Sequence, residues 1–193
     1  MLSFPARLAA RYEAALVARP VPTKMATGCA LWSLGDFTAQ SLTRADGEAL
    51  DGARLGRVAV YGGLLHAPIA HVHYNFLEWA VVRADVAVAR RPVVKVVVEQ
   101  FVYWGYFSNA LYHFAMATFE GAPPSAAVDR VRDRLWPTML AQWSFWIPVQ
   151  YLNFRFIPVR HQLNVVLTTS VAWTAFLSWT FPPAKAEGPD RDL

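Results

Sequence analysis

Residues 135–154 read LWPTMLAQWSFWIPVQYLNF, a run of 20 residues that contains no Asp, Glu, Lys or Arg. With a rise of about 1.5 Å per residue, an α-helix of this length crosses the hydrocarbon core of a bilayer. The run is also rich in Trp, Phe and Tyr, whose amphipathic rings favour the membrane interface. We therefore expect a membrane-spanning helix over about residues 135–155.

Other parts of the chain show the same pattern. Residues 58–77, 100–119 and 161–184 also lack charged side chains, and residues 25–43 contain a single one, Asp36. So many uncharged runs in 193 residues leave too little polar chain to cover them in water. The sequence thus predicts an all-α fold, a polytopic transmembrane helix bundle. Its four to five membrane-spanning helices are expected at about residues 24–43, 58–77, 97–119, 135–155 and 161–181.

The composition agrees with a lipid environment. Charged residues make up 17% of the chain, whereas a soluble domain carries about 25%. We expect one multi-pass membrane domain over residues 1–181, followed by a polar disordered tail over residues 182–193. The net charge is +4, but its basic residues lie between the uncharged runs and form no stripe, so nucleic acid is not an expected partner. The single cysteine, Cys29, excludes an intrachain disulfide.

Polar side chains inside the uncharged runs are the candidate functional residues, because ionisable groups are costly in a membrane. Asp36 lies well inside the first run, and Lys95 and Glu99 are four residues apart, so they can pair on one helix face. These side chains either line a polar pathway or act as interhelical locks that fix the packing. The candidate pore or polar-network residues are Asp36, Gln40, Lys95, Glu99, Gln100, Gln150 and Asn153.

The histidines raise the question of a metal enzyme. On an ideal helix His66 and His73 share one face, but His71 lies about 140° away, which is poor geometry for one metal. The carboxylates that a di-iron site needs are scarce, and no nucleophile or phosphate-binding motif occurs. We therefore expect no enzymatic activity, no cofactor and no metal site. A membrane enzyme with a His-bound metal is the least favoured alternative.

Several motifs together indicate a family. The stretch Trp143–Pro158 spaces its Trp, Gln, Asn, Phe and Pro residues in a distinctive way, and shorter elements surround Gly35, Pro68 and Lys95. Together they resemble the Mpv-seventeen/peroxisomal membrane protein twenty-two-kilodalton family of small eukaryotic organelle membrane proteins, over about residues 12–178. Ala67, His73 and Ile147 depart from the family pattern, which is typical of a divergent member. The residues that the resemblance identifies as structural are Gly35, Pro68, His71, Tyr74, Trp143, Trp146, Pro148, Phe154, Pro158 and Trp173.

The resemblance implies a location and a role. The location is an organelle membrane, with the mitochondrial inner membrane favoured and the peroxisomal membrane as the alternative. The role is that of a weakly selective channel or permeability factor for small solutes, linked to organelle homeostasis. Expected partners are membrane lipid and small solutes, with a homo-oligomer left open. A structural or partner-binding membrane protein without transport is the alternative function.

Residues 1–19 allow two interpretations. They contain Arg7, Arg11 and Arg19 but a single acid, Glu13, which is typical of a mitochondrial presequence. The alternative is an interfacial helix that belongs to the mature fold. We favour the interfacial helix, because the family resemblance begins inside this segment.

Overall fold

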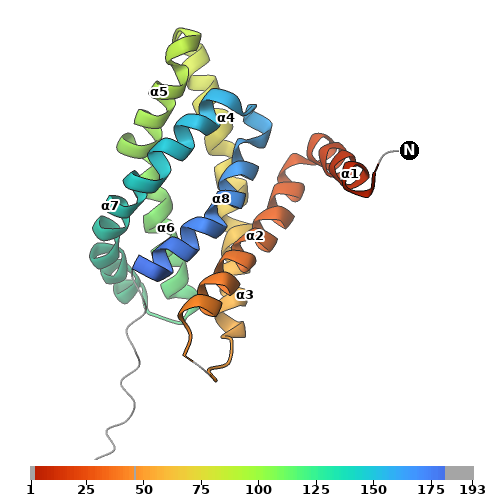
Figure 1. The fold of residues 1–193 in the computed structure, drawn as a ribbon. Helices are drawn as coiled ribbons and strands as arrows, with labels where there is room; N and C mark the ends of the chain where they lie inside the picture. Colours follow the sequence, from red (N-terminus) through yellow and green to blue (C-terminus); the bar gives the residue numbers. More distant parts are fainter. Residues whose placement is uncertain (1–2, 46, 181–193) are drawn as a thin grey trace, which may run out of the picture.

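The computed structural model describes residues 3–45 and 47–180, and all regular elements in this part of the chain are helical (Figure 1). The predicted all-α fold is therefore confirmed. The expected tail at residues 182–193 lies outside the described residues. The α-helices are α1 (Phe4–Ala18), α2 (Pro20–Thr43), α3 (Gly52–Val60), α4 (Ala67–Arg83), α5 (Arg91–Val97), α6 (Trp104–Phe119), α7 (Pro124–Phe156) and α8 (Val159–Thr180), with π-helical η1 (Tyr61–His66) and η3 (Val98–Val102) and the 3-10 turn η2 (Val88–Arg90).

Among the helices of the described chain, none is at once long enough and apolar enough to cross a membrane. The four to five membrane-spanning helices therefore stay a prediction. The helix boundaries also differ from the bounds of the uncharged runs. The run at residues 135–154 is the second half of α7, which already begins at Pro124 and continues through Pro137 and Pro148.

A continuous helical rod runs from Gly52 to Arg83 through α3, η1 and α4. Pro68 lies inside this rod, although a proline lacks the N–H donor and its ring crowds the preceding turn. The N–H of Ala67 bonds to the carbonyl of Gly62, five residues back, which is the wider spacing of a π-helix. The π-helical segment therefore lets the chain pass Pro68 without ending the rod.

Helix α2 packs between this rod and α8. Two glycines permit the close approach on its two sides. A Cβ at Gly28 would lie 2.5 Å from the carbonyl oxygen of Gly62, and one at Gly35 would lie 3.2 Å from Oγ1 of Thr174. Small residues at helix contacts of this kind let backbones approach closely. Gly35, which the family resemblance identified, is thus one of the points at which α2 and α8 are in close contact.

The core lies where α4, α6, α7 and α8 meet. Its apolar members include Tyr74, Trp104, Trp146, Leu163 and Leu167, all of them buried. Helices α7 and α8 are joined by a turn at Ile157 and Pro158, so the short connection expected between the last two runs is present. This turn places the second half of α7 and the start of α8 beside the polar centre of the bundle.

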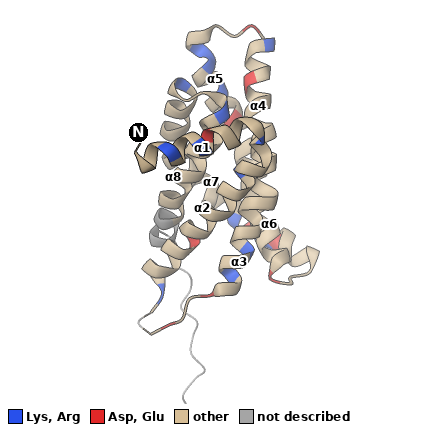
Figure 2. Ribbon diagram, turned by 90° about the vertical axis from the view of Figure 1, so that its right-hand side faces the viewer, with Lys and Arg blue, Asp and Glu red and all other residues tan. Residues whose placement is uncertain are grey.

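The outer surface of the bundle is apolar in many places, while several charged and amide side chains, among them Asp36, Glu99 and Gln150, are buried. On α4, Val72, Phe76 and Trp79 are exposed, whereas His73 on the same helix is buried. Figure 2 shows long stretches of ribbon without charge, and many of the charged positions lie near the ends of the helices. Buried charged groups of this kind are uncommon in a protein in water.

Helix α1 stands at an angle beside the start of α2 (Figure 1). The hydroxyl groups of Tyr12 and Thr27 are 3.0 Å apart, which ties α1 to α2. Glu13 lies 3.3 Å from both Arg160 and His161 at the start of α8. Residues 4–18 thus form a helix that contacts α2 and α8, and both interpretations of residues 1–19 stay predictions.

Candidate functional site

A cavity of about 160 Å³ lies inside the bundle and is lined by residues of α2, α3, η1, α4, η3, α6, α7 and α8. One part of its wall carries the ion pair of Asp36 and Arg54, and another part carries Glu99, Gln100 and Gln150. Four of the seven polar candidates from the sequence therefore line one internal space. This space is the candidate functional site.

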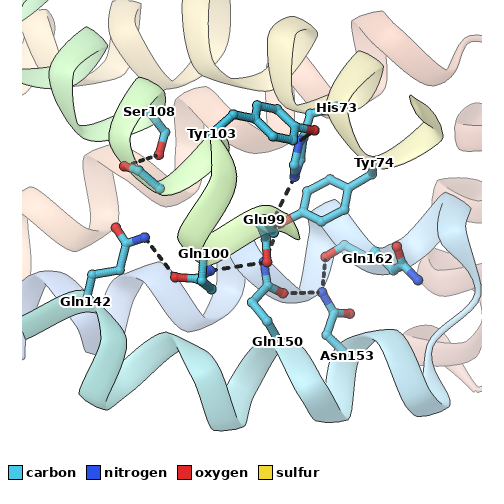
Figure 3. Close-up of polar contacts among 11 residues, drawn as sticks. His73, Tyr74, Glu99, Gln100, Tyr103, Ser108, Gln142, Gln150, Asn153 and Gln162 are labelled. Atoms are coloured by element: carbon cyan, nitrogen blue, oxygen red, sulfur yellow. Dashed lines mark hydrogen bonds and ion pairs between the residues drawn. The ribbon is translucent and has the colours of Figure 1, made fainter. Parts of the chain in front are cut away.

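Glu99 is the centre of the polar interior and is fully buried (Figure 3). Its Oε1 accepts a hydrogen bond of 2.5 Å from Nε2 of Gln150 and lies 3.3 Å from Nε2 of His73. The hydroxyl of Tyr74 donates to the same oxygen at 3.4 Å, and Nε2 of Gln100 donates to Oε2 at 3.2 Å. Four neutral or titratable donors thus replace the water that a carboxylate loses on burial.

The neutral imidazole of His73 fits its surroundings. Its Nδ1 lies 2.7 Å from the hydroxyl of Tyr103, and its ring stacks on Trp104 with centroids 3.8 Å apart. With the proton on Nε2, the ring donates to Glu99 and accepts from Tyr103, so both contacts are satisfied. We assign this tautomer from the hydrogen-bond pattern.

A chain of amides extends from Glu99 toward α6. Nε2 of Gln142 donates to Oε1 of Gln100 at 3.0 Å, and Nδ2 of Asn109 donates to Oε1 of Gln142. The indole of Trp143 donates to the backbone carbonyl of Gln100 at 3.2 Å. This carbonyl belongs to η3, so Trp143 satisfies a backbone group in a segment where α-helical bonding is interrupted.

A second chain of amides extends from Glu99 toward the turn before α8 (Figure 3). Nε2 of Gln150 donates at 2.8 Å to the hydroxyl of Tyr74, in addition to its bond with Glu99. Nδ2 of Asn153 donates to Oε1 of Gln150 at 2.9 Å and to the backbone carbonyl of Gln162 at 3.2 Å. The network therefore links α4, η3, α7 and α8.

Asp36 and Gln40 form a separate cluster at the other part of the cavity. Oδ1 of Asp36 accepts from Nε of Arg54 at 2.8 Å, and Oδ2 accepts from Nε2 of Gln40 at 2.8 Å. The carboxylate is 3% exposed, whereas the side chain of Arg54 is 41% exposed. Oε1 of Gln40 accepts from the backbone N–H of Asp51 at 2.7 Å, so this cluster ties the end of α2 to the start of α3.

Lys95 has a different partner from the one its spacing suggested. Its Nζ donates to the carboxylate of Glu78 on α4, and it lies 5.4 Å from the ring centroid of Phe154. The expected pairing with Glu99 is therefore wrong. A π-helical turn begins at Val98, between the two residues, and Lys95 meets α4 while Glu99 meets the amides of α7. In the sequence Glu78 marked only the end of an uncharged run.

The remaining motif residues support the bundle. Nδ1 of His71 lies 3.0 Å from Nζ of Lys24. Lys24 is buried, and the sequence did not single it out. The rings of Trp146 and Trp173 are 6.1 Å apart and connect α7 with α8. Pro148 lies inside α7. Pro158 lies in the turn that follows α7.

Comparison with known proteins agrees with these motifs. A model of the Mpv17 / PMP22 family matches residues 117–178, which include the Trp143–Pro158 stretch. Protein SYM1 of Gibberella zeae is 33% identical over 175 residues, which cover 87% of this chain and 94% of that protein. This chain belongs to the Mpv17 / PMP22 family. The resemblance inferred from the motifs is thereby confirmed, and the protein is an organelle membrane protein of this family.

Further relatives cover a similar share of the chain. Protein SYM1 of Mycosarcoma maydis is 32% identical over 157 residues, covering 81% of this chain and 77% of that protein. Protein SYM1 of Saccharomyces cerevisiae is 29% identical over 177 residues, covering 87% of each. No solved structure matches this member of the Mpv17 / PMP22 family.

Sequence reasoning missed several residues of this Mpv17 / PMP22 site. Arg54, His73, Asn109 and Gln142 each contact a predicted network residue or one of its direct partners. The amides were visible as polar positions inside uncharged runs, but nothing in their spacing pointed to partners on other helices. His73 was noted as a possible metal ligand and as a departure from the family pattern, and neither observation pointed to Glu99 as its partner. As for metal ligands, the described ranges contain no group of three or more His, Cys, Asp or Glu side chains that could hold an ion.

Proposed function

We propose that this Mpv17 / PMP22 protein is a weakly selective channel or permeability factor for small solutes in an organelle membrane. The mitochondrial inner membrane is the favoured location and the peroxisomal membrane the alternative, and the role is organelle homeostasis without catalysis. The single observation that carries the proposal is the internal cavity between the Asp36–Arg54 ion pair and the buried Glu99 network. A polar space inside an apolar bundle is what a solute path through lipid requires.

The outer surface supports a lipid environment around this cavity. Leu64 of η1, Val102 of η3 and Leu152 of α7 are each more than half exposed, and they come from three different parts of the chain. Exposed apolar surface of this extent is typical of contact with a membrane or another protein. Lipid around the bundle would cover these side chains, and membrane lipid is therefore the first expected partner.

The amide part of the cavity wall suits small polar solutes. The amides of Gln100, Gln142 and Gln150 carry both hydrogen-bond donors and acceptors and no charge. Such groups replace part of a solute's hydration shell without holding the solute tightly, which permits passage. In the Asp36–Arg54 ion pair the side chain of Arg54 is partly exposed, so the pair is placed to act as a charged gate.

The test is electrical recording from the purified full chain in planar bilayers. We expect discrete conductance steps, and we expect Asp36→Asn to change the conductance or the ion selectivity because it removes the charge of the gate. Asp129→Asn is the matched control, since Asp129 is exposed near the start of α7 and does not line the cavity. A silent bilayer with correctly folded protein would contradict the proposal.

One observation favours a second candidate, a structural or partner-binding membrane protein without transport. Both oxygens of Glu99 are occupied by donors from neighbouring side chains, as in an interhelical lock. If the polar residues serve only packing, Asp36→Asn lowers thermal stability in detergent and no solute flux depends on it. Measuring both properties on the same variant separates the two functions. Size-exclusion chromatography with light scattering on that preparation tests the homo-oligomer.

A further inference from the structure

Aromatic rings form a corner in the wall of the cavity. The ring of Tyr61 is nearly perpendicular to that of Trp32, with centroids 5.0 Å apart and an angle of 74°. It is also nearly perpendicular to the ring of Tyr112, at 5.2 Å and 79°. His66 and Trp104 continue this wall, with ring centroids 6.4 Å apart. Aromatic cages bind organic ammonium groups by cation–π contact, and several rings that line one cavity supply such a cage.

The wall of the cavity also carries an uncompensated negative charge. Asp36 is balanced by Arg54 at 2.8 Å. In the described part of the chain, the only titratable base within ion-pair distance of Glu99 is His73, and the neutral tautomer of His73 satisfies both of its contacts. A carboxylate buried among neutral groups attracts a cation strongly, because the surroundings screen the charge poorly. The electrostatics of the cavity thus select for a positive charge.

Two buried polar atoms on this wall lack a protein partner among the described residues. They are Nε1 of Trp32 and Nδ1 of His66, whose rings are 5.3 Å apart. The side chain of His66 is 8% exposed. Buried polar atoms are normally hydrogen-bonded, so an orphaned pair on a cavity wall points to a ligand group. A hydroxyl fits both atoms, since it accepts from the indole N–H and donates to an unprotonated imidazole nitrogen.

From these three observations we propose that the cavity binds a small hydroxyalkyl-ammonium cation, with its ammonium group in the aromatic corner and its hydroxyl between Trp32 and His66. The buried carboxylate of Glu99 supplies the counter-charge. The volume agrees, because the cavity measures about 160 Å³ and an engineered cavity of about 150 Å³ holds a benzene molecule. The binding site stands independently of whether the protein conducts.

The first test uses two probes of nearly equal shape on the unaltered full chain in detergent. Choline carries the charge and the hydroxyl, and 3,3-dimethylbutan-1-ol replaces its nitrogen by carbon and is neutral. We expect choline to raise the unfolding temperature in a dose-dependent way and to bind at least about tenfold more tightly than the alcohol by calorimetry. Equal binding of both probes, or binding of neither, would overturn the proposal.

The second test uses variants. Glu99→Gln removes the charge with little change in shape, and we expect it to abolish the preference for choline over the neutral alcohol. Glu120→Gln is the matched control, since it removes one negative charge from an exposed ion pair with Arg130 outside the cavity. Choline preference that survives Glu99→Gln in folded protein counts against the site. If Glu99→Gln fails to fold, the comparison of the two probes on the unaltered chain still decides.

A third test examines where the hydroxyl of the ligand binds. Tetramethylammonium keeps the charge and lacks the hydroxyl, so it is expected to bind less tightly than choline. Trp32→Phe keeps a ring in the corner and removes the N–H donor, so the advantage of choline over tetramethylammonium is expected to shrink. An unchanged ratio would rule out the placement of the hydroxyl at Trp32. If the protein binds choline but shows no conductance in bilayers, only the channel proposal is refuted. If it conducts but does not bind choline, only the binding-site proposal is refuted.

Discussion

The side-chain amide of Gln150 on α7 donates a hydrogen bond of 2.5 Å to the carboxylate of Glu99 in η3, 51 residues away in the chain. The same amide also contacts the hydroxyl of Tyr74 on α4. One side chain thus joins three parts of the bundle at a buried negative charge. The stability of the bundle is expected to depend on this contact more than on any single apolar pair.

Replacing Gln150 by Leu tests this expectation. The substitution keeps the size of the side chain and leaves Glu99 without its shortest donor, and hydrogen bonds to charged groups contribute about 1.5–3 kcal/mol. We expect the free energy of unfolding in detergent to fall by about 2 kcal/mol, measured by thermal or denaturant unfolding. Asn75→Leu, at an exposed position of α4, is the control and is expected to have a small effect. Similar losses of unfolding free energy from both variants would show that the Gln150–Glu99 hydrogen bond stabilises the bundle no more than an exposed amide does.

The ion pair of Lys95 and Glu78 is unequal, and the two single substitutions should differ. The Lys95 side chain is 4% exposed, whereas that of Glu78 is 35% exposed. Glu78→Gln leaves a buried ammonium group without its counter-charge, while Lys95→Met leaves a carboxylate that reaches solvent. We expect Glu78→Gln to lower the unfolding temperature more than Lys95→Met, because an uncompensated buried charge is strongly destabilising. The reverse order would mean that the packing of the lysine stem outweighs its charge.

The sequence predicted the helices better than their contacts. Missing charges and the Trp143–Pro158 motif indicated an all-helical chain, and the regular elements of the described residues are all helical. Local spacing depends on the helical period, which a sequence displays directly. The membrane spans remain a prediction.

Contacts between helices were not readable in this way. Lys95 contacts Glu78 instead of Glu99, and the spacing of Gln142 gave no indication that its amide contacts Gln100. The π-helical segments beginning at Tyr61 and Val98 shift the faces of their helices, and spacing rules assume a constant period. Partners on other helices depend on these shifts and on packing, so they appear only in three dimensions.

At the other part of the cavity, Arg54 should be more important than its neighbour Arg57. Arg54 contacts the buried Asp36 at 2.8 Å, and Arg57 contacts the half-exposed Asp51 at 3.7 Å. Exposed pairs contribute about 0–1 kcal/mol, and breaking a buried pair costs about 3–5 kcal/mol. Because Arg54 is itself partly exposed, we expect Arg54→Gln to lower the free energy of unfolding by about 1–2 kcal/mol.

Arg57→Gln is the matched variant, with the same change of charge one helical turn away. We expect its effect on unfolding to stay within about 0.5 kcal/mol. The difference between the two variants should shrink in high salt less than it would for two exposed pairs, because Asp36 is screened from solvent. Equal effects of the two substitutions would show that the ion pair with Asp36 does not hold α2 in place.

Two glycines in neighbouring parts of the fold should respond to alanine with opposite signs. A Cβ at Gly28 would lie 2.5 Å from the backbone oxygen of Gly62, and backbone atoms cannot move aside as a flexible side chain does. Overpacking of this kind costs about 1–3 kcal/mol. We therefore expect Gly28→Ala to lower the free energy of unfolding by about 2 kcal/mol.

At Gly56, inside α3, a Cβ would meet no atom within 4 Å. Alanine at an open helical position restricts the unfolded chain and favours the helix, so Gly56→Ala should raise the free energy of unfolding by about 0.5–1 kcal/mol. Both variants are measured by thermal unfolding in the same detergent, with circular dichroism to confirm helical content. If Gly28→Ala is neutral or stabilising, α2 and η1 are not held in close backbone contact at Gly28 and Gly62.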